Sequence, residues 1–128
     1  MDERKKVILI VDDEPGMRDM LTWCLGESGF EIKLARDGEE AIKELAEGDV
    51  DLVVTDLTMP HLDGFKLLEA IGARKPRTAA IVISGFGTVE MAVHAMSRGA
   101  SDFLLKPFDP AHLVCRIKEV FASNGHAP

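Results

Sequence analysis

The apolar positions of this chain form five short continuous runs, separated by longer segments in which apolar residues recur every three or four positions. The runs have the length and residue types of buried strands, and they lie at residues 7–11, 31–35, 51–55, 79–84 and 102–105. The other segments have a helical repeat and lie at residues 15–28, 38–46, 65–73, 89–98 and 110–122. Gly29 and Gly99 are predicted to end the first and fourth helices, and Thr88 to cap the start of the fourth.

The regular alternation of strand and helix predicts an α/β fold, in which helices cover both faces of a parallel sheet through right-handed crossovers. Five strands in 128 residues favour a flavodoxin-like, doubly wound sheet with strand order 2-1-3-4-5 and five helices in a three-layer αβα arrangement. We expect one domain over residues 1–128, with its core at about 5–122 and a polar tail at 123–128.

Charge and composition narrow the classes of function. Lys and Arg total 15 against 22 Asp and Glu, so the net charge is −7, and direct binding to nucleic acid or to an anionic membrane is not expected. No apolar segment of signal or membrane-spanning length is present, which favours the cytoplasm. Cys24 and Cys115 lie in apolar helical stretches without metal-ligand spacing, and we expect both to be buried thiols.

Polar side chains stand at the carboxyl ends of four predicted strands. Asp12 and Asp13 follow the first strand and Asp56 follows the third, while Ser84 ends the fourth and Lys106 follows the fifth. Parallel strands bring these ends to one edge of the sheet, where ligands bind near the reversal of the strand order. Clustered carboxylates need a cation, and oxygen ligands suit Mg²⁺. The combination of these carboxylates with the ammonium of Lys106 and the hydroxyl of Ser84 predicts phosphoryl transfer onto an aspartate.

Four motifs surround these residues: VDDEP at 11–15, VTDLTMPHLDG at 54–64, ISGFGT at 83–88 and LLKPF at 104–108. In this order and spacing, the chain resembles the receiver domains of two-component response regulators (CheY-like) over nearly its whole length. The stretch GTVEMAVHAMSRGASDFLLKPF, residues 87–108, further resembles the receivers attached to NtrC-type transcriptional activators.

The resemblance implies that Asp56 accepts a phosphoryl group from the phosphohistidine of a sensor histidine kinase. It implies that Asp13, Asp56 and the backbone carbonyl of Thr58 bind Mg²⁺, or Mn²⁺, with Asp12 assisting directly or through water. Lys106 would pair with the phosphoryl group. The chain would then be no enzyme but a phosphoacceptor that assists its own phosphorylation and dephosphorylation.

The same resemblance implies a conformational switch in which Ser84 moves toward the phosphoryl group and the aromatic ring of Phe103 turns inward. Phe103 is equally well explained as a core residue, because its position in a strand predicts burial. The implied output surface comprises the fourth helix, the fifth strand and the last helix, and it would contact an output domain, a downstream protein or a second copy in a phosphorylation-dependent dimer. Pro107 would follow a cis peptide bond.

This chain departs from the family pattern at some positions. Ser84 stands where Thr is more usual and keeps the hydroxyl, whereas Phe103 replaces Tyr and loses it. Thr58 and Phe86 take the two variable positions beside the phosphoryl group, and the apolar ring of Phe86 is predicted to hinder the attack of water.

Other functions remain open at this point. A haloacid-dehalogenase-like phosphatase also uses an aspartate at a strand end with Mg²⁺, but it needs a second Asp where this chain has Thr58. A flavodoxin-like FMN carrier would bind the phosphate after the first strand, where Asp12, Asp13 and Glu14 repel it. A receiver that signals without phosphorylation is a further alternative.

Overall fold

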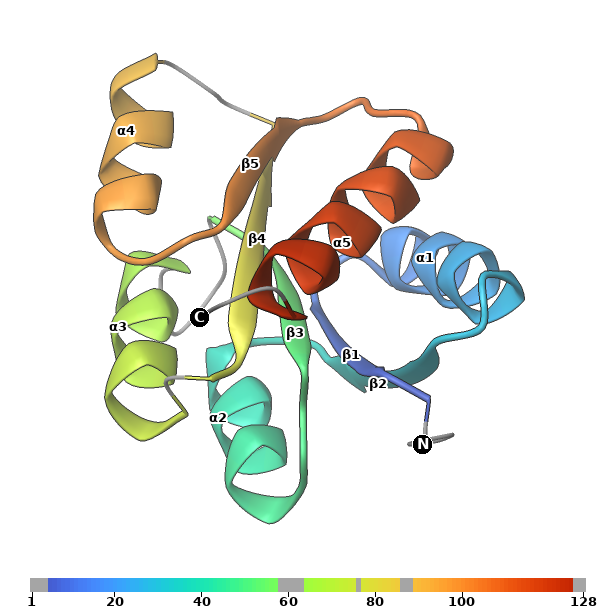
Figure 1. Ribbon diagram of the computed structural model, residues 1–128, viewed down its shortest axis with the longest axis horizontal. Helices are drawn as coiled ribbons and strands as arrows, with labels where there is room; N and C mark the ends of the chain where they lie inside the picture. The colour runs from blue at the N-terminus through green and yellow to red at the C-terminus, as the bar shows by residue number, and fades with distance from the viewer. Residues whose placement is uncertain (1–4, 58–63, 76, 86–88, 126–128) are drawn as a thin grey trace.

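The computed structural model describes residues 5–57, 64–75, 77–85 and 89–125. Five parallel strands form one sheet in the order β2-β1-β3-β4-β5, and five helices connect and follow them (Figure 1). The predicted fold class and strand order are therefore confirmed. The strands are β1 (Val7–Val11), β2 (Glu31–Ala35), β3 (Leu52–Asp56), β4 (Ala79–Ser84) and β5 (Asp102–Leu105). The helices are α1 (Pro15–Glu27), α2 (Gly38–Glu47), α3 (Gly64–Arg74), α4 (Val89–Ser97) and α5 (Pro110–Gly125).

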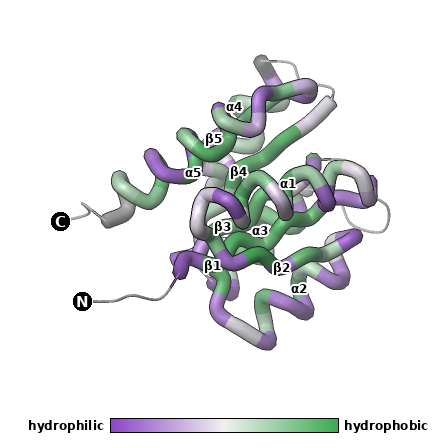
Figure 2. Tube along the Cα trace, turned by 90° about the vertical axis from the view of Figure 1, so that its right-hand side faces the viewer, coloured by the Kyte–Doolittle hydropathy of each residue, from purple (hydrophilic) through white to green (hydrophobic). Residues whose placement is uncertain are grey.

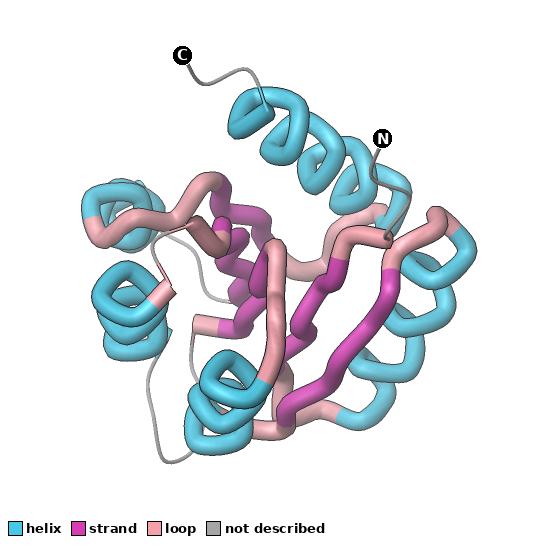
Figure 3. Tube along the Cα trace, turned by 60° about the horizontal axis from the view of Figure 1, so that its bottom comes forward, coloured by secondary structure: helices cyan, strands magenta, loops and turns pink. Residues whose placement is uncertain are grey.

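Two hydrophobic cores lie on the two faces of the sheet, because successive side chains of a strand point to opposite faces. On β1, Ile8 and Ile10 pack against α1 and α5, whereas Leu9 and Val11 pack on the side of α2, α3 and α4. The three central strands are buried along nearly their whole length and are mostly hydrophobic (Figure 2), and Figure 3 shows helices on both sides of the sheet. This double burial explains why the central strands read as continuous apolar runs in the sequence.

The ends of several elements test the sequence predictions further. Gly29 and Gly99 have φ values of +94° and +105° after α1 and α4, so the predicted glycine stops are confirmed. Helix α5 continues to Gly125, three residues into the predicted polar tail. An apolar pattern marks where a helix packs, whereas its backbone hydrogen bonds can continue through polar residues, and this explains the difference.

The prediction for the cysteines was wrong for Cys115, which is exposed, while Cys24 is half-buried. Leu113 and Ile117 are four residues apart and fully buried on one face of α5. Cys115 lies midway between them in sequence and therefore points to the opposite side of the helix. None of the helices in the described part of the chain is long and apolar enough to cross a bilayer.

Candidate functional site

The site lies where the order of the strands reverses, between β1 and β3. Val11 of β1 pairs with Thr55 of β3, so Asp12 and Asp56 come next on neighbouring strands at the carboxyl edge of the sheet. On the far side of β3, Ile83 pairs with Asp56 and Ser84 follows it. The parallel register therefore brings together strand ends that are far apart in the sequence.

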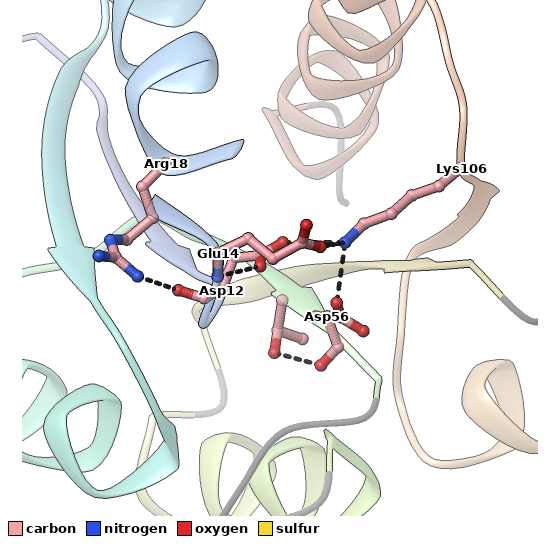
Figure 4. A network of polar contacts seen from close by, with 6 residues as sticks. Asp12, Glu14, Arg18, Asp56 and Lys106 are labelled. Atoms are coloured by element: carbon pink, nitrogen blue, oxygen red, sulfur yellow. Dashed lines mark hydrogen bonds and ion pairs between the residues drawn. The ribbon is translucent and has the colours of Figure 1, made fainter. Parts of the chain in front are cut away.

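Lys106 links these strand ends through its ammonium group. Its Nζ atom lies 2.9 Å from Oδ2 of Asp56, 3.1 Å from Oδ2 of Asp12 and 3.2 Å from Oε1 of Glu14 (Figure 4). Its backbone N–H also donates to the carbonyl of Ser84, with an N to O distance of 2.8 Å, which ties the end of β5 to the end of β4. The predicted proximity of Asp12, Asp56 and Lys106 is therefore found in the structure.

Burial and charge act in opposite directions on the ionisable groups of the site. Burial raises the pKa of the fully buried Asp12 carboxyl, although the N–H of Glu14 and the ammonium of Lys106 act to lower it. Burial also acts to lower the pKa of Lys106, but hydrogen bonds to Asp56 and Asp12 outweigh it and hold that pKa above its usual value. Lys106 is therefore an ammonium group at neutral pH and a permanent counter-charge for these carboxylates.

Four carboxylates meet at this edge of the sheet. One oxygen from each of Asp12, Asp13, Glu14 and Asp56 lies within 4.8 Å of the others, and Asp13 and Glu14 are exposed while Asp12 and Asp56 are buried. One ammonium cannot balance four carboxylates, and clustered oxygen ligands that are partly open to water suit a divalent cation such as Mg²⁺. The donor set therefore fits the metal that the sequence predicts.

Backbone contacts hold the acidic residues in place. Oδ1 of Asp12 accepts a hydrogen bond from the N–H of Glu14 at 2.9 Å, and the carbonyl of Asp12 accepts one from Nη1 of Arg18 at 2.7 Å. Thr55 Oγ1 donates to the carbonyl of Asp56 at 2.9 Å. These contacts orient the Asp12 carboxylate and hold the backbone of Asp12 and Asp56, and they leave the oxygens that meet Lys106 unused.

Gly64, the first residue of α3, lies directly against the backbone that follows the site. A Cβ atom at this position would lie 2.8 Å from Cα of Leu57 and 2.9 Å from the carbonyl oxygen of Asp56. The N–H of Gly64 donates to the carbonyl of Leu57 at 2.7 Å. A glycine here therefore lets α3 approach the chain just after Asp56.

Three contributors were missed by the sequence reasoning: Glu14 as a partner of Lys106, Arg18, and the close approach of Gly64. Glu14 stands beside the acidic pair in the sequence, which is a signal that could have been used. Arg18 lies one turn into α1 and donates to the backbone carbonyl of Asp12. Every residue has such a carbonyl, so the sequence gives no indication of this contact.

The two predicted switch residues lie on the last two strands of the sheet. Ser84 is 1% exposed at the end of β4. Phe103 is half-buried on β5 and packs on the core that also contains residues of α3 and α4. The cis peptide bond before Pro107 is present, as predicted. Thr58 and Phe86, to which the family resemblance gives a metal-binding carbonyl and a role in phosphoryl lifetime, lie outside the described residues.

Known proteins resemble this chain in sequence and in fold. The family model "Response regulator receiver domain" matches residues 8–118. A putative NtrX-like response regulator of Rickettsia bellii is 41% identical over 113 residues, which are 87% of this chain and 24% of that protein. The chain thus spans about a quarter of the length of this curated relative.

Solved structures agree with these matches. A CheY-like receiver domain from Methanospirillum hungatei has a TM-score of 0.91 at 28% identity, covering 95% of this chain and 98% of its own. The beryllofluoride-activated NtrC4 receiver domain dimer has a TM-score of 0.88 at 35% identity, covering 92% and 98%. Because the family model matches residues 8–118 and these solved structures share the fold, the chain belongs to the response regulator receiver domain family.

Proposed function

We propose that this chain is a phosphorylation-dependent switch of a two-component system and that Asp56 is its phosphoacceptor. The observation that carries the proposal is the position of the Asp56 carboxylate, at the end of a buried central strand, beside three other carboxylates and 2.9 Å from the ammonium of Lys106. Asp56 itself is buried, with 8% of its residue surface exposed.

In the proposed reaction, a carboxylate oxygen of Asp56 forms a bond to phosphorus while the bond between phosphorus and the imidazole nitrogen of a phosphohistidine breaks. The imidazole of the donor, a sensor histidine kinase, leaves with the electron pair and takes up a proton. Lys106 keeps its positive charge and pairs with an oxygen of the transferred group. Ser84 donates a hydrogen bond to another oxygen of that group.

Asp13 and Asp56 would bind Mg²⁺, or Mn²⁺, with Asp12 assisting directly or through water and the carbonyl of Thr58 completing the protein ligands. When bound, the cation supplies positive charge that neutralises the phosphoryl oxygens. Glu14 and Lys106 flank these ligands, so the phosphoryl group would meet one ammonium and one further carboxylate at the rim of the site.

Ser84 and Phe103 are proposed to carry the change from the site to the surface made of α4, β5 and α5. Three exposed apolar side chains lie on α4 and β5: Val93, Met96 and Leu105. An apolar surface of this kind suits a protein partner, such as an output domain, a downstream protein or a second copy of the chain. The dimeric state named for the NtrC4 receiver supports the last of these.

Residues 1–128 act as one receiver domain in the cytoplasm, with no direct contact to nucleic acid or membrane. The chain assists its own phosphorylation and dephosphorylation but turns over no free substrate, which separates it from a phosphatase.

The test is to incubate the chain with acetyl phosphate and Mg²⁺ and to measure its intact mass. We expect the wild type to gain one phosphoryl group, and Asp56→Asn or the wild type with EDTA to gain none. A wild type that gains no mass would contradict the proposal. Steady hydrolysis of phosphomonoesters would favour the phosphatase alternative instead.

A further inference from the structure

Helix α4 lies less deeply on the sheet than its neighbour α3. Among the side chains of α4 that the structure describes, Ala95 alone is fully buried, whereas α3 buries Leu67, Leu68 and Ile71. Val93 and Met96 of α4 are 62% and 46% exposed. A helix of nine residues is not stable by itself in water, so contacts with neighbouring elements must decide where α4 lies.

Two side-chain contacts join α4 to α3. The ring of His94 lies on the ring of Phe65, with centroids 4.4 Å apart and an angle of 56° between the planes. The guanidinium of Arg98 forms an ion pair with the carboxylate of Glu69. Figure 1 shows α4 directly above α3 on the same side of the molecule.

The spacing of the four residues makes the two contacts one strip. Phe65 and Glu69 are four residues apart on α3, and His94 and Arg98 are four residues apart on and just after α4, so each pair lies on one face of its helix. On α4 this face is turned away from Val93 and Met96. The strip therefore holds the side of α4 that is opposite to its exposed apolar residues.

The strip lies at the carboxyl-terminal half of α4, where the helix ends in its own backbone hydrogen bonds. The N–H of Arg98 donates to the carbonyl of His94, and the N–H of Ala100 donates to the carbonyl of Ala95, both at 3.1 Å. Phe65 of the strip, Met91 of α4 and Phe103 of β5 all pack against the same hydrophobic core.

We propose that Phe65, Glu69, His94 and Arg98 form an α3–α4 clamp that holds α4 in its resting position and opposes its movement when the site is phosphorylated. The inference rests on the proposed function, because it concerns how that signal reaches the output surface. The clamp sets how often the unphosphorylated chain visits the active arrangement, since a contact present in one state only shifts the population between the two.

The first test is hydrogen exchange of residues 90–98 in the unphosphorylated protein. Arg98 and Glu69 keep 37% and 56% of their side-chain surface exposed, so their ion pair is of the modest, solvent-screened kind. In Glu69→Gln and in Arg98→Gln we therefore expect amide exchange in α4 to be about two- to five-fold faster. The charge-exchanged double variant Glu69→Lys with Arg98→Glu should restore most of the protection.

A matched control removes an exposed ion pair elsewhere. Arg36 and Glu40 form such a pair at the start of α2, with an N to O distance of 2.7 Å. Glu40→Gln should leave exchange in α4 at the wild-type rate. Exchange in α4 that is the same in all single variants and in the wild type would overturn the clamp.

The second test separates a clamp that opposes activation from a contact that only stabilises α4. Beryllofluoride with Mg²⁺ serves as the phosphoryl mimic, and its affinity is measured by calorimetry. In Glu69→Gln and in Arg98→Gln, beryllofluoride should bind more tightly, by up to the factor by which amide exchange in α4 becomes faster. The reason is that beryllofluoride binding and the release of α4 are linked equilibria. Faster exchange with unchanged or weaker beryllofluoride affinity would assign the contacts a structural role only and overturn the proposal.

The same variants distinguish this inference from the proposed function. None of the four clamp residues belongs to the phosphoryl site, so Glu69→Gln and Arg98→Gln should still gain one phosphoryl mass from acetyl phosphate. Normal phosphorylation with unchanged exchange and affinity would reject the clamp alone. Loss of phosphorylation in the wild type as well would reject the proposed function.

Discussion

Single residues at the carboxyl edge of the sheet show how one side chain serves two purposes. Asp12 contributes both to the turn before α1 and to the site. Its two oxygens divide these roles: Oδ1 accepts from the N–H of Glu14 at the start of α1, and Oδ2 meets Lys106. Function and local structure thus use the same residue, and a sequence pattern alone cannot separate them.

Asp13→Asn is predicted to stabilise the metal-free protein while weakening its binding of Mg²⁺. Asp13 belongs to a cluster of four carboxylates within 4.8 Å, and removing one charge relieves repulsion of about 1 kcal/mol at its exposed position. Urea unfolding at low ionic strength measures the stability, and calorimetry measures the affinity. Asp19→Asn, an exposed change on α1 outside this cluster, is the control and should alter neither by a comparable amount.

Gly64→Ala is predicted to destabilise the fold and to disturb the chain after Asp56. The added Cβ would lie under 3 Å from backbone atoms of Leu57 and Asp56, and such crowding costs about 1–3 kcal/mol. Gly72→Ala in the same helix meets no atom within 4 Å and should stabilise the protein by about 0.5–1 kcal/mol. Equal effects of the two substitutions on urea unfolding would contradict the assigned contact.

At the scale of elements, α1 and α2 begin in different ways. Asp37 caps α2, since its side chain accepts a hydrogen bond from the N–H of Glu40 at 2.9 Å. Glu14 occupies the equivalent position before α1 but makes no side-chain cap, and its carboxylate contacts Lys106 instead. The start of α1 depends on Pro15 and on the Asp12 turn, so the site and the helix share one segment of chain.

Asp37→Ala is predicted to lower the free energy of unfolding by about 0.5–2 kcal/mol, because the first turn of α2 loses its cap. Phosphorylation of Asp56 should be unaffected, since α2 contributes none of the site residues. Asp37→Asn keeps an oxygen acceptor and should recover most of the stability. A substitution to Ala with no effect on chemical unfolding would show that water replaces the cap at no cost.

Across the whole molecule, Mg²⁺ binding is predicted to stabilise the folded state by mass action. At a free concentration of 100 times its dissociation constant, the gain is about 2.7 kcal/mol, and the thermal midpoint should rise accordingly. NaCl at equal ionic strength is the control, because it screens the carboxylates without binding between them. A midpoint that responds equally to both salts would contradict a specific site.

Most of the fold could be predicted because the local pattern of apolar residues indicates each strand and helix. The strands β4 and β5 begin and end where the apolar pattern predicts, and the alternation of strands and helices predicts that the sheet is parallel. Boundaries that depend on backbone hydrogen bonds alone, such as the end of α5, were predicted less well. The exposure of Cys115 was missed because an apolar stretch does not show by itself which face of a helix is buried.

The sequence by itself determined which residues stand at the strand ends, and hence that Asp12, Asp56 and Lys106 would meet. The reason is that a parallel sheet brings all its carboxyl ends to one edge whatever its detailed packing. Only the tertiary structure decided that Glu14 turns to Lys106, that Gly64 lies on the backbone of Leu57, and that α4 is joined to α3 by Arg98. These contacts depend on distances between elements and on the directions of side chains, and no local pattern of residues encodes either.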